Sequence, residues 1–162
     1  MDIKDQVPSL ETCKRRKELG LSQDSLFWWT WDQESNPKHW YLVYYPNGVS
    51  QKAIENDWII SAPLASETLD RLPKEAIDSE VINYFPTELT ITKSDKGYYI
   101  CYKNLSEIGY SGDIDNDEDI EPKDNKFYES LAEAAAKMEV FLAEHNLLPN
   151  RGRYDKKNSR NL

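Results

Sequence analysis

The sequence predicts an α+β protein with a roughly four-stranded, mainly antiparallel sheet and about three helices, in the order α-β-β-α-β-β-α. Three patterns support this prediction. Two aromatic runs within residues 26–45 are typical of strands, residues 88–103 are typical of a β-hairpin, and residues 131–145 repeat apolar side chains at helical spacing. This order of elements predicts helices mainly on one face of the sheet.

The first predicted helix spans residues 10–19. Ser9 is a suitable N-cap, and Gly20 lies where a left-handed residue commonly ends a helix. Basic side chains at residues 14–17 occupy most sides of the helix, so we expect it at the surface. The few side chains that can face a core are Leu10 and Cys13, with Leu21 beyond the end of the helix.

Residues 16–26 resemble the opening of a phage-repressor helix-turn-helix, in which Gly20-Leu21-Ser22-Gln23 begins the second helix. A recognition helix should follow within a few residues. Residues 27–31 are instead aromatic, without a helical period or base-reading polar side chains. DNA binding through a helix-turn-helix is therefore an alternative rather than the preferred interpretation.

The aromatic runs, residues 26–32 and 39–45, hold four of the five tryptophans. Because side chains alternate along a strand, both faces of this pair are apolar. We expect the last helix to cover one face and the other face to stay partly open for a partner. Core packing of both faces is the simpler alternative. The candidate interaction surface consists of Trp28, Trp29, Trp31, Trp40, Tyr41 and Tyr44.

Three features lie between the aromatic runs and the hairpin. Pro46-Asn47-Gly48 is a turn, Trp58-Ile59-Ile60 is a third strand or a buried connection, and a short helix begins at Pro63 and ends at Pro73. An apolar edge suits this helix for packing against the sheet; it is formed by Leu64, Ala65, Leu69 and Leu72.

The predicted hairpin joins residues 88–93 to residues 98–103. Gly97 supplies the positive φ of a three-residue loop, which pairs Ser94 with Tyr98. Cys101 is expected to be a small core residue rather than a nucleophile. This register places four side chains on one face, namely Leu89, Ile91, Tyr99 and Cys101.

An acidic segment follows the hairpin. Its carboxylates, at alternate positions from Asp113, imitate a calcium-binding loop, but Glu118 stands where glycine is needed and Pro122 interrupts the pattern. We expect a solvated acidic loop at residues 113–124 and no bound metal.

Ser130 and Glu133 predict a capping box at the start of the last helix, which we expect to end near His145. Its apolar stripe comprises Leu131, Ala134, Ala135, Met138, Phe141 and Leu142. Residues 1–148 then form a single α+β domain. Residues 149–162 form a basic tail that we expect to be disordered.

Composition restricts the possible partners. The chain has 162 residues, with 29 acidic and 20 basic side chains and a net charge of −9, which disfavours nucleic acid and favours basic partners. No run approaches the roughly 18 apolar residues of a membrane span, and residues 1–6 contain no apolar signal core, so we expect no targeting segment. The two cysteines lie far apart and suggest no disulfide or zinc site. We expect a cytoplasmic protein that does not bind membranes.

An enzyme needs convergent polar groups, which this sequence does not place. It has no glycine-rich phosphate loop and no nucleophile-elbow pattern, and its only histidines are His39 and His145. We therefore predict no catalytic residue, no cofactor and no metal ligand. A small enzyme that uses some of the many carboxylates is the second alternative.

Six stretches form a recognisable pattern: residues 7–20, residues 23–29, Ser61-Ala62-Pro63, residues 69–73, Gly97-Tyr98-Tyr99 and residues 130–134. Together they resemble a family of small hypothetical proteins from phages, prophages and mobile elements of gut bacteria, over roughly residues 7–148. The resemblance implies a phage-related accessory protein and assigns no role to any residue. With the aromatic strands and the acidic charge, it favours a protein that acts by macromolecular interaction. The expected partner is a protein, either a second copy of the chain or a basic host protein.

Overall fold

The computed structural model describes residues 3–32, 34, 37–73, 87–104 and 127–148. The acidic loop at 113–124 and the basic tail at 149–162 lie outside these residues. In chain order the elements are a 3-10 helix (Ile3–Gln6), α1 (Leu10–Glu18), β1 (Phe27–Trp31), β2 (Trp40–Tyr44), α2 (Gln51–Glu55), β3 (Ile59–Ser61), α3 (Ala65–Leu69), β4 (Thr87–Ser94), β5 (Gly97–Asn104) and α4 (Leu131–Glu144). The predicted α+β class is confirmed.

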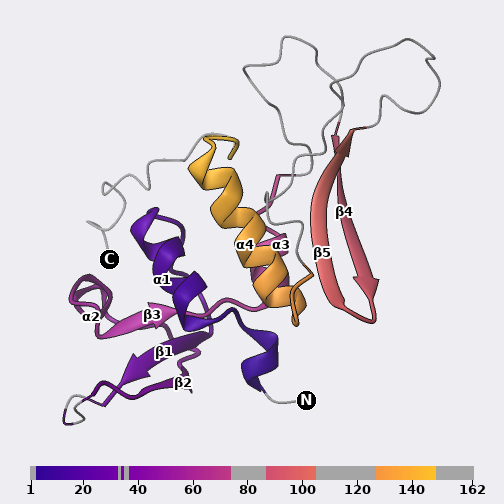
Figure 1. Cartoon of the computed structure of the whole chain (residues 1–162). Helices are drawn as coiled ribbons and strands as arrows, with labels where there is room; N and C mark the ends of the chain where they lie inside the picture. Colours follow the sequence, from indigo (N-terminus) through magenta and orange to yellow (C-terminus); the bar gives the residue numbers. More distant parts are fainter. Residues whose placement is uncertain (1–2, 33, 35–36, 74–86, 105–126, 149–162) are drawn as a thin grey trace, which may run out of the picture.

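The strands form two sheets and not the single sheet that the sequence predicts. Instead of one sheet of about four strands, the described residues form a three-stranded antiparallel sheet in the order β2-β1-β3 and a separate hairpin, β4-β5. Within Trp58-Ile59-Ile60, the two isoleucines belong to strand β3, which continues to Ser61 and pairs with β1. Helices α1, α3 and α4 lie between the three-stranded sheet and the hairpin (Figure 1).

Helix α4 occupies the centre of the molecule rather than one face of a sheet. It contacts α1, α3 and β5, and most of its side chains are buried. Small side chains allow this approach from several sides, because five alanines lie within the helix: Ala132, Ala134, Ala135, Ala136 and Ala143. The predicted apolar stripe is confirmed. The expectation that α4 covers the aromatic strands is wrong, since α1 takes that place.

Three groups of apolar side chains form the core. The largest surrounds α4 and includes Met138, Leu142, Ile100 and Tyr102. A second joins the three-stranded sheet to α1 and the segment before it, through Cys13, Ile60 and their neighbours. A third, smaller group joins Leu21 to the C-terminal half of α4. The two sheets therefore do not share a core directly, and the helices connect them.

The capping box at the start of α4 forms only in part. The Ser130 hydroxyl accepts the Glu133 backbone N–H at 3.1 Å, as predicted. The Glu133 carboxylate, however, lies against the start of α1, where it accepts the Ser9 backbone N–H at 2.7 Å and the Thr12 hydroxyl. A negatively charged acceptor at a helix N-terminus stabilises that helix. The Glu133 carboxylate of α4 therefore both stabilises the start of α1 and connects the two helices.

The register of the hairpin differs from the prediction by one residue. Ser94 pairs with Gly97 across a two-residue turn, not with Tyr98. A shift of one residue exchanges the two faces of a strand. The core face consequently carries Leu89 and Ile100, whereas Cys101 lies on the opposite face, where it is also buried.

Gly97 is required for a close backbone approach as well as for the turn. Its φ is +124°, and Tyr98 exchanges two backbone hydrogen bonds of 2.8 Å with Tyr128. A Cβ atom on Gly97 would lie 2.2 Å from the Tyr128 carbonyl oxygen. The hairpin is thus held against the segment that leads into α4.

We predict that Gly97→Ala lowers the free energy of unfolding by at least about 2 kcal/mol, because strained backbone and a steric clash add. Gly48→Ala is the matched control, since Gly48 has a φ of +75° but no atom within 4 Å of its Cβ position. It should cost only about 1 kcal/mol. Urea unfolding of both variants measures the difference, and equal costs would contradict the close approach.

Candidate interaction surface

The three-stranded sheet has two apolar faces, as the sequence predicts. On the inner face, Phe27, Trp29 and Trp31 of β1 lie beside Tyr44, Leu42 and Trp40 of β2. On the outer face, Trp28 and Thr30 lie beside Val43 and Tyr41, with Ser61 and Ile59 of β3 on their other side.

The inner face is structural. It packs against α1 and the segment before it, and the Trp29 indole donates to the Pro8 carbonyl oxygen at 3.2 Å. The Trp31 indole donates to the Asp57 carbonyl oxygen at 3.3 Å. Lys14 lies over the Trp40 ring at 5.1 Å, which adds a cation–π contact. Trp29 and Trp40 thus hold the sheet against α1 and the segment before it, and Trp31 holds it to the turn after α2.

The outer face remains partly open. Trp28 and Ile59 are buried, but Tyr41 is 43% exposed. The face continues one residue beyond the strands, where the Tyr45 backbone N–H donates to the Leu26 carbonyl oxygen at 2.9 Å. Tyr45 is 45% exposed and Leu26 is 39% exposed. Large apolar groups with this exposure are common at protein interfaces.

The six residues predicted as an interaction surface do not share one face. Trp28 and Tyr41 belong to the outer face, whereas Trp29, Trp31, Trp40 and Tyr44 belong to the inner one. Tyr44 is exposed at the edge of the sheet, while Trp28 is buried. Leu26 and Tyr45 were not predicted as site residues, although each lies two positions from an outer-face residue of its own strand.

A cleft of about 780 Å³ adjoins the outer face. Trp28 of β1 and Leu26 just before it line the cleft on one side, and Glu67 of α3 and Arg71 of the turn that follows line it on another. The indole N–H of Trp28 is buried with no acceptor in the described part of the chain. The remaining wall comes from the segment between α1 and β1, from the segment between β2 and α2, and from α2 itself, with residues Gly20, Leu21, Ser22, Gln23, Asp24, Ser25, Pro46, Gly48, Val49, Gln51 and Ile54.

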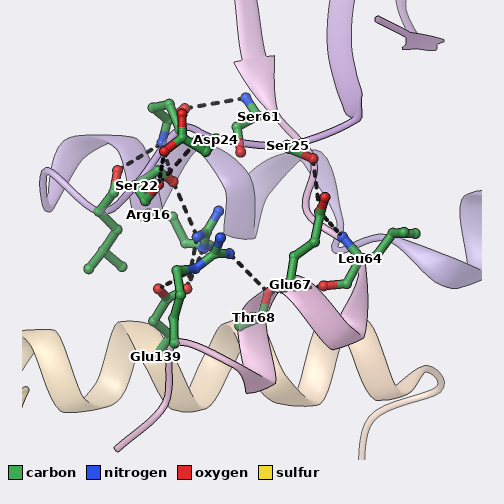
Figure 2. A network of polar contacts seen from close by, with 12 residues as sticks. Arg16, Ser22, Asp24, Ser25, Ser61, Leu64, Glu67, Thr68 and Glu139 are labelled. Carbon is green, nitrogen blue, oxygen red and sulfur yellow. Dashed lines mark hydrogen bonds and ion pairs between the residues drawn. The ribbon is translucent and has the colours of Figure 1, made fainter. Parts of the chain in front are cut away.

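A buried ion-pair network supports the wall of the cleft (Figure 2). Arg16 is 0% exposed, and its Nε and Nη2 both lie 2.8 Å from Oε2 of Glu139. Oε1 of Glu139 accepts from Nε of Arg71 at 3.3 Å. Nη2 of Arg16 also donates to the Ser22 carbonyl oxygen at 3.4 Å, which holds the segment after α1. The prediction that α1 is a surface helix is therefore wrong on the side of Arg16, which is buried.

Glu67 orders the opposite side of the cleft. Its carboxylate accepts the Leu64 backbone N–H at 2.7 Å, the Ser25 hydroxyl at 3.1 Å and the Leu26 backbone N–H at 3.4 Å. One carboxylate thus caps α3 and anchors the start of β1 (Figure 2). All three donors are neutral, and Arg71 makes its ion pair with Glu139 rather than with Glu67.

The thiols are unsuited to nucleophilic chemistry. Burial raises the pKa of Cys13 to about 12, so its thiolate is scarce near neutral pH. Cys101 is also buried, as predicted. The described residues contain no group of three or more His, Cys, Asp or Glu side chains placed to hold a metal ion. In the same residues, no helix is long and apolar enough to cross a membrane.

The helix-turn-helix alternative fails at its second helix. Gly20 adopts the predicted left-handed conformation, with a φ of +70°. Residues 21–26 contain no helix, and β1 begins at Phe27. The Ser22-Gln23 pair of the resemblance lies instead in the wall of the cleft, where Gln23 accepts the Ser61 backbone N–H at 3.3 Å.

No family model, curated protein or solved structure matches the chain.

We predict that Glu139→Gln lowers the free energy of unfolding by about 3–5 kcal/mol, because it leaves two guanidinium groups without their charged partner. Arg16→Met should cost less, since Arg71 still pairs with Glu139. Arg15→Met is the matched control one position earlier, where the side chain is exposed and pairs with Glu18 and Glu144. Its urea midpoint should stay close to that of the wild type. A Glu139→Gln midpoint equally close to wild type would contradict the role of the network.

Proposed function

We propose that this protein is a phage or mobile-element accessory protein that acts by binding another protein through the outer face and the adjoining cleft. The phage connection rests on the sequence resemblance. The binding surface rests on the distribution of exposed apolar side chains.

That distribution is the observation that carries the proposal. Seven large apolar side chains are exposed among the described residues, and five of them belong to the three-stranded sheet or its ends: Leu26, Tyr41, Tyr44, Tyr45 and Trp58. Three of the five, Leu26, Tyr41 and Tyr45, lie on the outer face. Tyrosine serves well as an interface anchor because it combines a large apolar area with few rotatable bonds.

The cleft gives the surface a recess for a partner's side chain. Leu26 belongs to both the outer face and the cleft, so the two are continuous. A ligand oxygen brought to the Trp28 indole would remove the cost of a buried donor without an acceptor, about 1–3 kcal/mol. Asp24, Glu67 and Arg71 add charges of both signs at the wall.

The net charge of −9 supports a basic host protein as the partner. Opposite net charges accelerate encounter and are screened by salt. A small enzyme that uses carboxylates is not favoured by any arrangement of the described side chains. Glu67 and Glu139 both have structural hydrogen-bond partners.

The test is affinity capture from host lysate with the wild type and with Leu26→Ser/Tyr41→Ser/Tyr45→Ser. We expect wild-type protein to enrich a basic protein at about 50 mM salt and to lose it at about 500 mM. The triple variant should fail to enrich it at either concentration, while keeping its melting temperature.

The control for lost apolar area is Ile3→Ser/Trp58→Ser/Ile91→Ser, which removes three similarly exposed side chains away from the outer face. This variant should capture the same protein as the wild type. The proposal fails if the two triple variants capture equally, or if the wild type enriches nothing.

A further inference from the structure

Strand β2 lies at one edge of the three-stranded sheet. In the described part of the chain it pairs with β1 alone, and β3 lies on the far side of β1. Edge strands are usually protected by a charged side chain, a proline or a bulge. Residues Trp40–Tyr44 contain none of these, and their register with β1 is continuous.

The register also determines which backbone groups of β2 are unpaired. The Tyr45 backbone N–H donates to the carbonyl oxygen of Leu26, the residue before β1. Because hydrogen-bonded positions alternate along an antiparallel strand, Tyr41 and Val43 also direct their N–H and C=O groups toward β1. Trp40, Leu42 and Tyr44 therefore direct theirs away from the sheet. No hydrogen bond from another described segment meets them.

We propose that two copies of the protein associate through these edges, with β2 of one copy antiparallel to β2 of the other and Leu42 on the twofold axis. This association is independent of the outer-face partner proposed above. It joins two three-stranded sheets into one sheet of six strands. Isologous contact of this kind is the commonest arrangement of homodimers.

The edge is self-complementary, which favours a second copy as the occupant. Trp40 and Tyr44 each lie two residues from Leu42 along β2. Twofold symmetry about Leu42 therefore places each Trp40 beside the partner's Tyr44, which pairs two aromatic side chains. All three residues have outward backbone groups, and these meet in register. The same kind of pairing already occurs on the inner face, where Trp31 and Trp40 rings are 6.4 Å apart and Phe27 and Tyr44 rings are 5.2 Å apart.

Net charge predicts how the association depends on salt. Each copy carries −9, so two copies repel one another at low ionic strength. Added salt screens this repulsion and should strengthen the dimer. A basic partner on the outer face has the opposite salt dependence, which keeps the two proposals distinguishable.

The test is sedimentation equilibrium of the full chain from about 1 µM to about 1 mM, at low and high salt. We expect a monomer–dimer equilibrium that shifts toward dimer at high salt. Tyr44→Pro should raise the dissociation constant about tenfold or more relative to Tyr44→Ala, because proline also removes the outward N–H in both copies. Tyr44 is 56% exposed, so neither variant removes a core side chain.

Amide hydrogen exchange followed by NMR locates the contact. The N–H groups of Leu42 and Tyr44 should exchange slowly in the dimer and quickly on dilution, while that of Val43 should stay protected by β1 at both concentrations. Three results would overturn the proposal: a monomer at about 1 mM, equal dissociation constants for Tyr44→Pro and Tyr44→Ala, or a dimer in which Leu42 and Tyr44 exchange quickly.

Discussion

The buried contact between Arg16 and Glu139 is the interaction on which most of this fold depends. It joins α1 to α4, and through Arg71 it includes the turn after α3. Removing two charges from water is costly, and a carboxylate shared by two guanidinium groups offsets that cost only while all three stay in place. The helices can therefore keep their position between the two sheets only while the side chains of Arg16, Arg71 and Glu139 keep these ion pairs.

The elements with a strong local pattern were predictable, whereas their arrangement was not. The capped, periodic α4 and the aromatic strands follow from spacing alone. The division into two sheets does not, because a strand's periodicity says nothing about which strand it pairs with. The hairpin illustrates the same limit, because a turn of two residues before Gly97, instead of three, exchanges the faces of β5 relative to β4.

The candidate surface was predictable as a region and not as a set of residues. Aromatic content identified the two strands, but exposure depends on which face α1 covers, and no local pattern records that contact. Arg16 and Glu139 were missed for a related reason. A charged residue on a helix appears solvent-facing until its partner, 123 positions away in the sequence, is known.

The Glu133 carboxylate at the start of α1 has a consequence for biosynthesis. Ser9 and Glu133 are 124 positions apart, so the N-terminal helix obtains this capping contact only after the last helix has emerged from the ribosome. Contacts of such long separation slow folding, because most of the chain must first be ordered. The aromatic strands pack against α1, so the stability of their cover also depends on this late contact. A newly made chain is then most exposed to aggregation just before its C-terminal helix docks.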